Sequence, residues 1–187
     1  MYFTLQEIDN IITEIWLINI KQDFVCNKIG YHEATLVSCF YFYLRKQLDM
    51  DKRLRIYLEV CFPDFSNERF DLVIFKSDKI STNDNKWNRD WGTPWVVIEF
   101  KFHPHIKENE AIADIQKLKD FVNFDHTIER VFFFSIDKND HLNRYVTRRG
   151  NWYADLFIEG RGLFEDNEWK FFLYNPTDDR YIDQSLE

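Results

Sequence analysis

Two charged residues interrupt an apolar run in the middle of the chain: Glu99 and Lys101, in the segment TPWVVIEFKFHPH (residues 93–105). Because side chains alternate along a strand, the two residues point to the same face, with Cα atoms about 6.5–7 Å apart. Burying an unpaired ion costs several kcal/mol. The residues therefore either form an ordinary ion pair, or provide a carboxylate for a hard cation and a mobile positive charge beside it.

A second acid interrupts an apolar run in the same way, Asp71 in RFDLVIF. Adjacent strands lie about 4.8 Å apart, so a matching register would bring Asp71 and Glu99 to one cation. Glu33, near the start of an apolar helical stripe, is a third candidate ligand. Clustered acids repel one another unless a cation neutralises them, and Mg²⁺ prefers a few carboxylates with water and phosphate. Lys101 would orient or deprotonate a water, or stabilise charge developing on a phosphate.

The elements that must position these residues follow from the hydrophobic periodicity. Apolar spacing predicts helices over 4–20, 31–48 and about 107–124, and alternating or continuous apolar runs predict strands over 53–62, 69–75, 95–102 and 130–136. Thr4 and Glu7 fit a capping box. Three consecutive strands indicate an antiparallel meander, and the following helix crosses over to a parallel fourth strand. The predicted fold is α/β, a mixed central sheet flanked by helices.

The same periodicity assigns side chains to faces. One face of the first strand is expected to hold Leu54, Ile56, Leu58, Val60 and Phe62, and one face of the third strand Trp95, Val97, Glu99 and Lys101. The last helix is expected to pack through Ala111, Ile115, Leu118 and Val122. In the tail, residues 153–159 are predicted to be helical or irregular and residues 168–175 to form a strand.

The order of helix glutamate, RFDLVIF, VVIEFKF, helix and strand resembles the PD-(D/E)XK, or restriction-endonuclease-like, nuclease superfamily over roughly residues 31–136. The resemblance implies an α-β-β-β-α-β core with an N-terminal helix and a C-terminal extension, in a single domain covering residues 1–187. It also implies Mg²⁺, with Mn²⁺ able to substitute, held by Asp71, Glu99 and Glu33 with the Phe100 carbonyl. The implied reaction is phosphodiester hydrolysis, with DNA the expected substrate and Lys101 assisting the water.

Two further positions bear on this resemblance. The superfamily often carries another polar residue on the helix after the third strand, and Lys117 is the better candidate here, with a solvated polar face as the competing interpretation. Asp114 and Phe121 share the face of Lys117 by their spacing, whereas Gln116 points elsewhere. A literal Pro63–Asp64 pair also occurs, but it falls in a turn-like segment, so Asp71 is preferred as the metal-binding acid.

Composition sets limits on these interpretations. The net charge is −8, from 32 acids and 24 bases, which argues against a non-specific nucleic-acid binder. A catalytically inactive module of the nuclease fold, binding nucleic acid or a protein partner, therefore stays as the alternative. A homodimer is compatible with cutting both strands of DNA. Three cysteines in no close pair, and no apolar run of about 18 residues, lead us to expect a cytoplasmic protein without membrane contact.

Two weaker signals complete the sequence. His103 and His105, with His32 or a cysteine, could suggest zinc, but the spacing of these residues is looser than in most zinc sites. Basic and aromatic residues alternate in the insert 76–94 and in TRRGNWY (147–153), a pattern that fits contact with phosphates and bases as well as ordinary packing.

Overall fold

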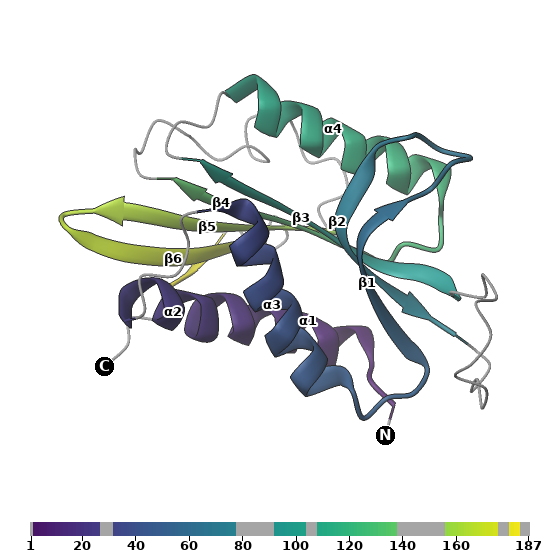
Figure 1. Cartoon of the computed structure of the whole chain (residues 1–187), viewed down its shortest axis with the longest axis horizontal. Coiled ribbons are helices and arrows are strands. Elements are labelled where there is room, and N and C mark those ends of the chain that lie inside the picture. Colours follow the sequence, from purple (N-terminus) through teal and green to yellow (C-terminus); the bar gives the residue numbers. More distant parts are fainter. Residues whose placement is uncertain are drawn as a thin grey trace.

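The central sheet of the computed structural model combines antiparallel and parallel strands. The structure describes residues 2–26, 32–77, 92–103, 108–137, 156–175 and 180–183. Within these ranges seven strands lie side by side in chain order (Figure 1): β1 Leu54–Cys61, β2 Arg69–Lys76, β3 Thr93–His103, β4 Arg130–Asp137, β5 Phe157–Glu165, β6 Glu168–Asn175 and β7 Arg180–Asp183. β1, β2 and β3 are antiparallel, β3, β4 and β5 are parallel, and β5, β6 and β7 are antiparallel. The predicted meander and the parallel fourth strand are confirmed.

Helices cover both faces of this sheet (Figure 1). One face packs against α1 Leu5–Glu14, a π-helical turn η1 Ile15–Ile20, α2 Lys21–Cys26 and α3 Glu33–Leu48, and the other face packs against α4 Glu108–Phe124. The predicted α/β class and α-β-β-β-α-β core, running from α3 to β4, are confirmed. Of the helices in the described ranges, none has both the length and the apolar character needed to span a bilayer.

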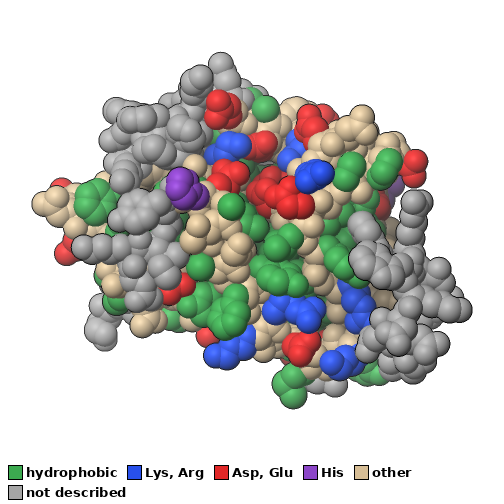
Figure 2. All heavy atoms as spheres, in the orientation of Figure 1, with side chains coloured by type: hydrophobic (Ala, Val, Ile, Leu, Met, Phe, Trp, Pro, Cys, Tyr) green, Lys and Arg blue, Asp and Glu red, His purple; other side chains and the backbone are tan. Residues whose placement is uncertain are grey.

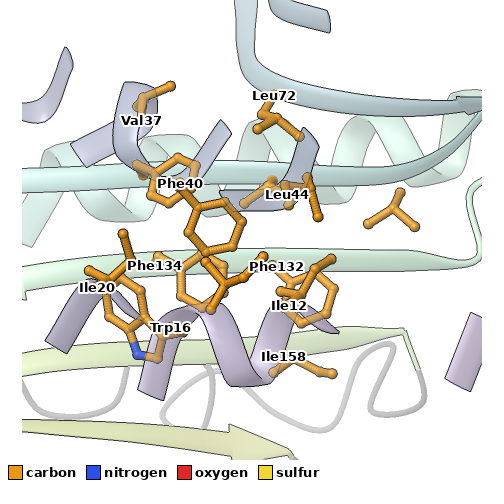
Figure 3. Close-up of a cluster of buried hydrophobic side chains, with 14 of the residues drawn as sticks. Ile12, Trp16, Ile20, Val37, Phe40, Leu44, Leu72, Phe132, Phe134 and Ile158 are labelled. Carbon is orange, nitrogen blue, oxygen red and sulfur yellow. The ribbon is translucent and has the colours of Figure 1, made fainter. Parts of the chain in front are cut away.

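Aromatic packing holds η1 and α3 on the sheet (Figure 3). The ring of Trp16 stacks on Phe134 at 4.4 Å between centroids, and its Nε1 donates to the carbonyl of Phe172 at 3.1 Å. Phe40 of α3 lies against both Phe134 and Phe100, at 5.3 and 5.1 Å. Such aromatic pairs stabilise a core by roughly 0.5–1.5 kcal/mol beyond their area. Because Phe40 lies two helical turns after the first residue of α3, its contact with Phe100 holds the start of that helix near the end of β3.

On the opposite face, α4 is held by the residues that its periodicity predicted. Ala111, Ile115, Leu118 and Val122 are all buried in one cluster with residues of β2, β3 and β4. Gln116 bonds to Asp120 on the exposed side, as expected from its phase. This seating turns the polar positions Asp114 and Lys117 toward β3.

Two of the predicted strand faces are wrong in part, for a local backbone reason in each case. Leu54 and Ile56 pack under α1–α3, but Val60 packs on the α4 side and Leu58 is partly exposed, because Glu59 adopts a positive φ of 53° that reverses the alternation. In β3 the register with β2 shifts by one residue opposite Ile74 and Phe75. Trp95 is the extra residue of this bulge, so it packs with the opposite cluster from Val97.

Two predicted elements also differ in extent or type. The first helix begins with the predicted capping box of Thr4 and Glu7, but it continues beyond residue 20 to Cys26. The π-helical turn changes the helical phase, which brings Phe24 onto the core. Of the segment 153–159, predicted to be helical or irregular, residues 157–159 form the start of strand β5, whose apolar residues face two different clusters, and residues 153–155 lie outside the described residues. The predicted strand over 168–175 is confirmed as β6.

Gly160 is required by the close approach of β5 to the Trp16–Phe134 stack. A Cβ atom at this position would overlap the ring of Phe134 and lie 3.0 Å from Nε1 of Trp16. We expect Gly160→Ala to lower the free energy of unfolding by about 1–3 kcal/mol, because overpacking a filled core forces its side chains out of their rotamers. Gly162→Ala is the matched control, since its nearest atoms lie at 3.1 Å and a smaller loss is expected. Urea denaturation of both variants measures the difference, and equal losses would contradict this explanation.

Candidate active site

The fork between β2 and β3 brings Asp71 and Glu99 together. Backbone pairing of the two strands runs from Lys76–Thr93 to Leu72–Ile98, and the continuing register places Asp71 opposite Glu99. At this point the amide of Phe100 donates to Oδ2 of Asp71 at 2.7 Å. The Asp71 side chain of β2 thus accepts the hydrogen bond that a backbone carbonyl would accept in a continuing ladder. The two acids face one another where the strands separate.

Burial and mutual repulsion alter the acidity of this pair. Burial raises the pKa of Asp71 to about 6. Hydrogen bonds from the Phe100 amide and with Glu99 act in the opposite direction but are weaker. The pKa of Glu99 is raised well above its ordinary value, chiefly by burial and next by the charge of Asp71. The pair therefore resists carrying two negative charges and favours a bound positive charge.

Two lysines face two acids in a crossed arrangement. Nζ of Lys117 lies 2.7 Å from Oε1 of Glu99, and Nζ of Lys101 lies 2.8 Å from Oδ2 of Asp114. The simple interpretation of Glu99 and Lys101 as an ion pair with each other is therefore wrong. The competing interpretation of Lys117, as part of a solvated polar face, is also wrong. Its side chain is only 10% exposed, and its Nζ donates to the carbonyl of Arg69 at 2.8 Å.

The environment of Lys101 keeps its ammonium charged. Burial alone would lower the pKa of Lys101, but the hydrogen bond and charge of Asp114, with the charges of Glu33 and Asp71, exceed that effect and raise it. A lysine that holds its proton cannot act as a general base at neutral pH. Of the roles predicted for Lys101, the geometry favours orienting a water or stabilising negative charge.

Glu33 approaches the same end of β3 from the first turn of α3. Its Oε2 accepts from the amide of Phe102 at 3.1 Å, two residues after the amide that Asp71 accepts. The helix phase explains this placement, because Glu33 continues the stripe through Phe40 that packs on β3. All three predicted acids are thus found around residues 99–102.

The described residues offer donors for a divalent cation but no closed metal site. No group of three or more His, Cys, Asp or Glu side chains among them is arranged to hold a metal ion. Oε1 of Glu99 is nevertheless buried without an aligned hydrogen bond, its contact with Lys117 being an ion pair. A buried carboxylate oxygen that already faces a positive charge, beside a second carboxyl group, fits a hard cation such as Mg²⁺. Lys117 occupies the charge position that such a cation would take.

The structure also places the weaker sequence candidates. Pro63 and Asp64 are exposed in a turn, away from the strand pair. His32 is exposed immediately before α3, whereas His105, residues 78–91 of the insert and the segment 147–153 lie outside the described residues. Asp114 shares a helix face with Lys117, as its spacing predicts, and its contact with Lys101 makes it a site residue that the sequence prediction did not include. An i, i+3 pair of opposite charges on the helix after an E-x-K strand was the available signal.

Charged side chains also gather on the surface near the elements that carry the site. In Figure 2, acidic side chains gather with lysine or arginine side chains next to them, in the region between α4 and the N-terminal end of α3. This mixed charge contrasts with the apolar packing on either side of the sheet. A polyanionic ligand would approach it favourably only where a cation offsets the carboxylates.

Comparison with known proteins gives one structural similarity. No family model matches the sequence, and no curated protein matches it. The structure is similar to that of P. aeruginosa NucC in its cAAA-bound form, with a TM-score of 0.47 and 15% identical residues, over 98% of this chain and 85% of NucC. The element order α-β-β-β-α-β and the strand register of this chain agree with the core that the sequence resemblance led us to expect.

Proposed function

We propose that this protein is a Mg²⁺-dependent nuclease that hydrolyses phosphodiester bonds in DNA. The observation that carries the proposal is the buried pair Asp71 and Glu99 at the strand fork, with the charged Lys101 two residues after Glu99. Buried acids that repel one another destabilise a fold, so their presence indicates a functional ligand.

Each residue of the site has its own role in this proposal. Asp71 and Glu99 would bind the cation, with Glu33 as a further carboxylate from α3, and Mn²⁺ is expected to replace Mg²⁺. A bound divalent ion polarises a phosphate and lowers the pKa of water. The ammonium of Lys101 would stabilise the negative charge that develops on the phosphate and orient the attacking water. Lys117 would release Glu99 when the cation binds, and its freed ammonium would then face the phosphates.

DNA cleavage by the full chain tests this function. We expect linear, circular or single-stranded DNA to be cut with Mg²⁺ or Mn²⁺ and left intact in EDTA. Lys101→Ala should lower the rate by about 100-fold or more, the usual size of a lost electrostatic contact at the reacting group. Lys46→Ala removes an exposed lysine from α3 and should cut like wild type.

The other outcomes separate the competing assignments. If RNA alone is cut, the nuclease assignment holds and the DNA assignment fails. If no nucleic acid is cut with either metal, the enzymatic proposal fails, and binding without cleavage would support the inactive nuclease-fold module instead. Cutting a duplex through both strands would require two copies of this single site, which sedimentation of the protein–DNA complex can detect.

A further inference from the structure

A buried arginine on β5 has no role in the site described above. Arg161 is 6% exposed, and its Nη2 atom is buried without a hydrogen-bond partner among the described residues. An arginine side chain stays protonated in proteins, so it cannot lose its charge on burial. A buried donor without a hydrogen-bond partner costs about 1–3 kcal/mol, and more when the group is charged. A fold retains such a donor at a net gain only if another group or a ligand satisfies it.

The strand register places Arg161 on the same face as the catalytic lysine. Lys101 of β3 pairs with Ser135 of β4, and Ser135 pairs with Arg161 of β5. Directly paired residues in neighbouring strands project from the same face of the sheet, so the three form one row across the parallel strands. At about 4.8 Å per strand, the Cα atoms of Lys101 and Arg161 are roughly 10 Å apart. Ser135 is buried between them and adds a hydroxyl to the row.

Acids also lie near this row. Glu159 precedes Arg161 by two residues on the same face, and Asp137 follows Ser135 by two residues, and both acids are buried. Each of them already takes part in an interaction of its own. Because Nη2 of Arg161 has no hydrogen-bond partner in the described part of the chain, neither acid satisfies that atom.

We propose that Arg161, with Ser135, binds a backbone phosphate of the nucleic acid next to the phosphate that is cut at Asp71, Glu99 and Lys101. Arginine suits this role because its planar guanidinium donates two parallel hydrogen bonds to phosphate oxygens. A Cα spacing of about 10 Å between Lys101 and Arg161 allows the two side chains to contact neighbouring phosphates of the same nucleic-acid strand. The inference rests on the proposed nuclease function for the identity of the ligand.

Binding of a fluorescein-labelled DNA, measured by anisotropy with Ca²⁺ in place of Mg²⁺, tests this proposal. We expect Arg161→Gln to weaken binding about tenfold or more and to reduce the slope of log affinity against log salt by about one. Arg161→Lys keeps the charge but loses the paired donors, so its DNA affinity should lie between those of wild type and Arg161→Gln. Arg45→Gln removes an exposed arginine of α3 and should bind like wild type.

Cleavage kinetics and melting distinguish this role from a structural one. In Mg²⁺ the proposal expects Arg161→Gln to raise KM for DNA while kcat stays within about threefold of wild type. Without DNA the melting temperature of Arg161→Gln should not fall, since a buried donor atom without a hydrogen-bond partner in the described part of the chain is removed. A lower melting temperature with unchanged DNA affinity would overturn the proposal, and so would unchanged affinity and unchanged KM.

The two proposals fail separately. If wild type never cuts any nucleic acid but Arg161→Gln binds DNA more weakly, the nuclease function fails and the phosphate contact stands. If wild type cuts and Arg161→Gln has the same affinity and KM, the nuclease function stands and the phosphate contact fails.

Discussion

Asp71→Asn is expected to abolish DNA cleavage and, in the absence of metal, to make the protein more stable at neutral pH. The asparagine keeps an oxygen that can accept from the Phe100 amide, as Asp71 does at 2.7 Å. It removes one of the two negative charges from the strand fork. Loss of a group that only supports a metal ligand costs roughly 10–100-fold, so loss of the ligand itself should cost more than about 100-fold.

The sign of the stability change follows from the raised pKa of Asp71. Burial lifts this pKa from the ordinary 3.8 to about 6 in the folded protein. An acid with a raised pKa in the folded state binds its proton more tightly there, so it reduces stability as the pH rises from 3.8 through 6. At 1.36 kcal/mol per pKa unit the full effect is about 3 kcal/mol above pH 6. Below pH 3.8 the effect is absent.

Urea denaturation of wild type and Asp71→Asn in EDTA, across pH 4 to 8, measures this effect. The variant should gain stability relative to wild type through this range, by up to about 3 kcal/mol at pH 8. Asp64→Asn is the matched control, because it makes the same substitution at an exposed turn residue. It should leave both cleavage and stability unchanged. A variant of Asp71 that is equally destabilised at every pH would show that the carboxylate is structural.

The sequence was a good guide to the elements and to the acids, because both depend on short-range patterns. Asp71, Glu99 and Glu33 each interrupt an apolar pattern whose period fixes where the side chain points, and the structure places them around the end of β3. The pairing of Glu99 with Lys117 and of Lys101 with Asp114 could not be predicted from short-range patterns. Whether Glu99 meets Lys101 or Lys117 depends on how α4 seats on the sheet, which is set by contacts such as Phe70 with Phe121.

Departures from regular backbone geometry explain the other differences. A single positive φ at Glu59, a bulge at Trp95 and a π-helical turn after Glu14 each shift a side-chain pattern by one position. The first and the last of these have no strong residue signature, since no glycine or proline marks them. Arg161 could not be found from the sequence for a different reason: its Nη2 atom has no hydrogen-bond partner among the described residues, and only a three-dimensional structure shows that.

Lys117→Met should have the largest effect on stability of any change in the site. It leaves Glu99 buried without the ammonium that lies 2.7 Å away, and it also removes the bond to the Arg69 carbonyl at the start of β2. Breaking one side of a buried ion pair costs about 3–5 kcal/mol. The loss should be greatest at pH 8 and smaller at pH 5, because the raised pKa of Glu99 lets it take up a proton once Lys117 is gone.

A double-mutant cycle in EDTA tests whether the loss comes from Glu99. Adding Glu99→Gln to Lys117→Met should recover more than half of the lost stability, because no buried charge then remains unpaired. Lys46→Met, at an exposed position on α3, should have little effect. Additive losses in the double variant would show that Lys117 acts through Phe70 and Arg69 instead of through Glu99.

Metal binding to the same variant decides whether Lys117 stands in for the cation. In wild type a divalent ion must displace the Lys117 ammonium from Oε1 of Glu99, whereas in Lys117→Met that oxygen is free of a competing charge. We therefore expect calorimetry to show tighter Mg²⁺ binding to Lys117→Met than to wild type, and Mg²⁺ to raise its melting temperature more. Cleavage should still fall, since the ammonium that Lys117 would turn toward the phosphates is lost. Weaker Mg²⁺ binding in the variant would show that Lys117 supports the metal site and does not compete with it.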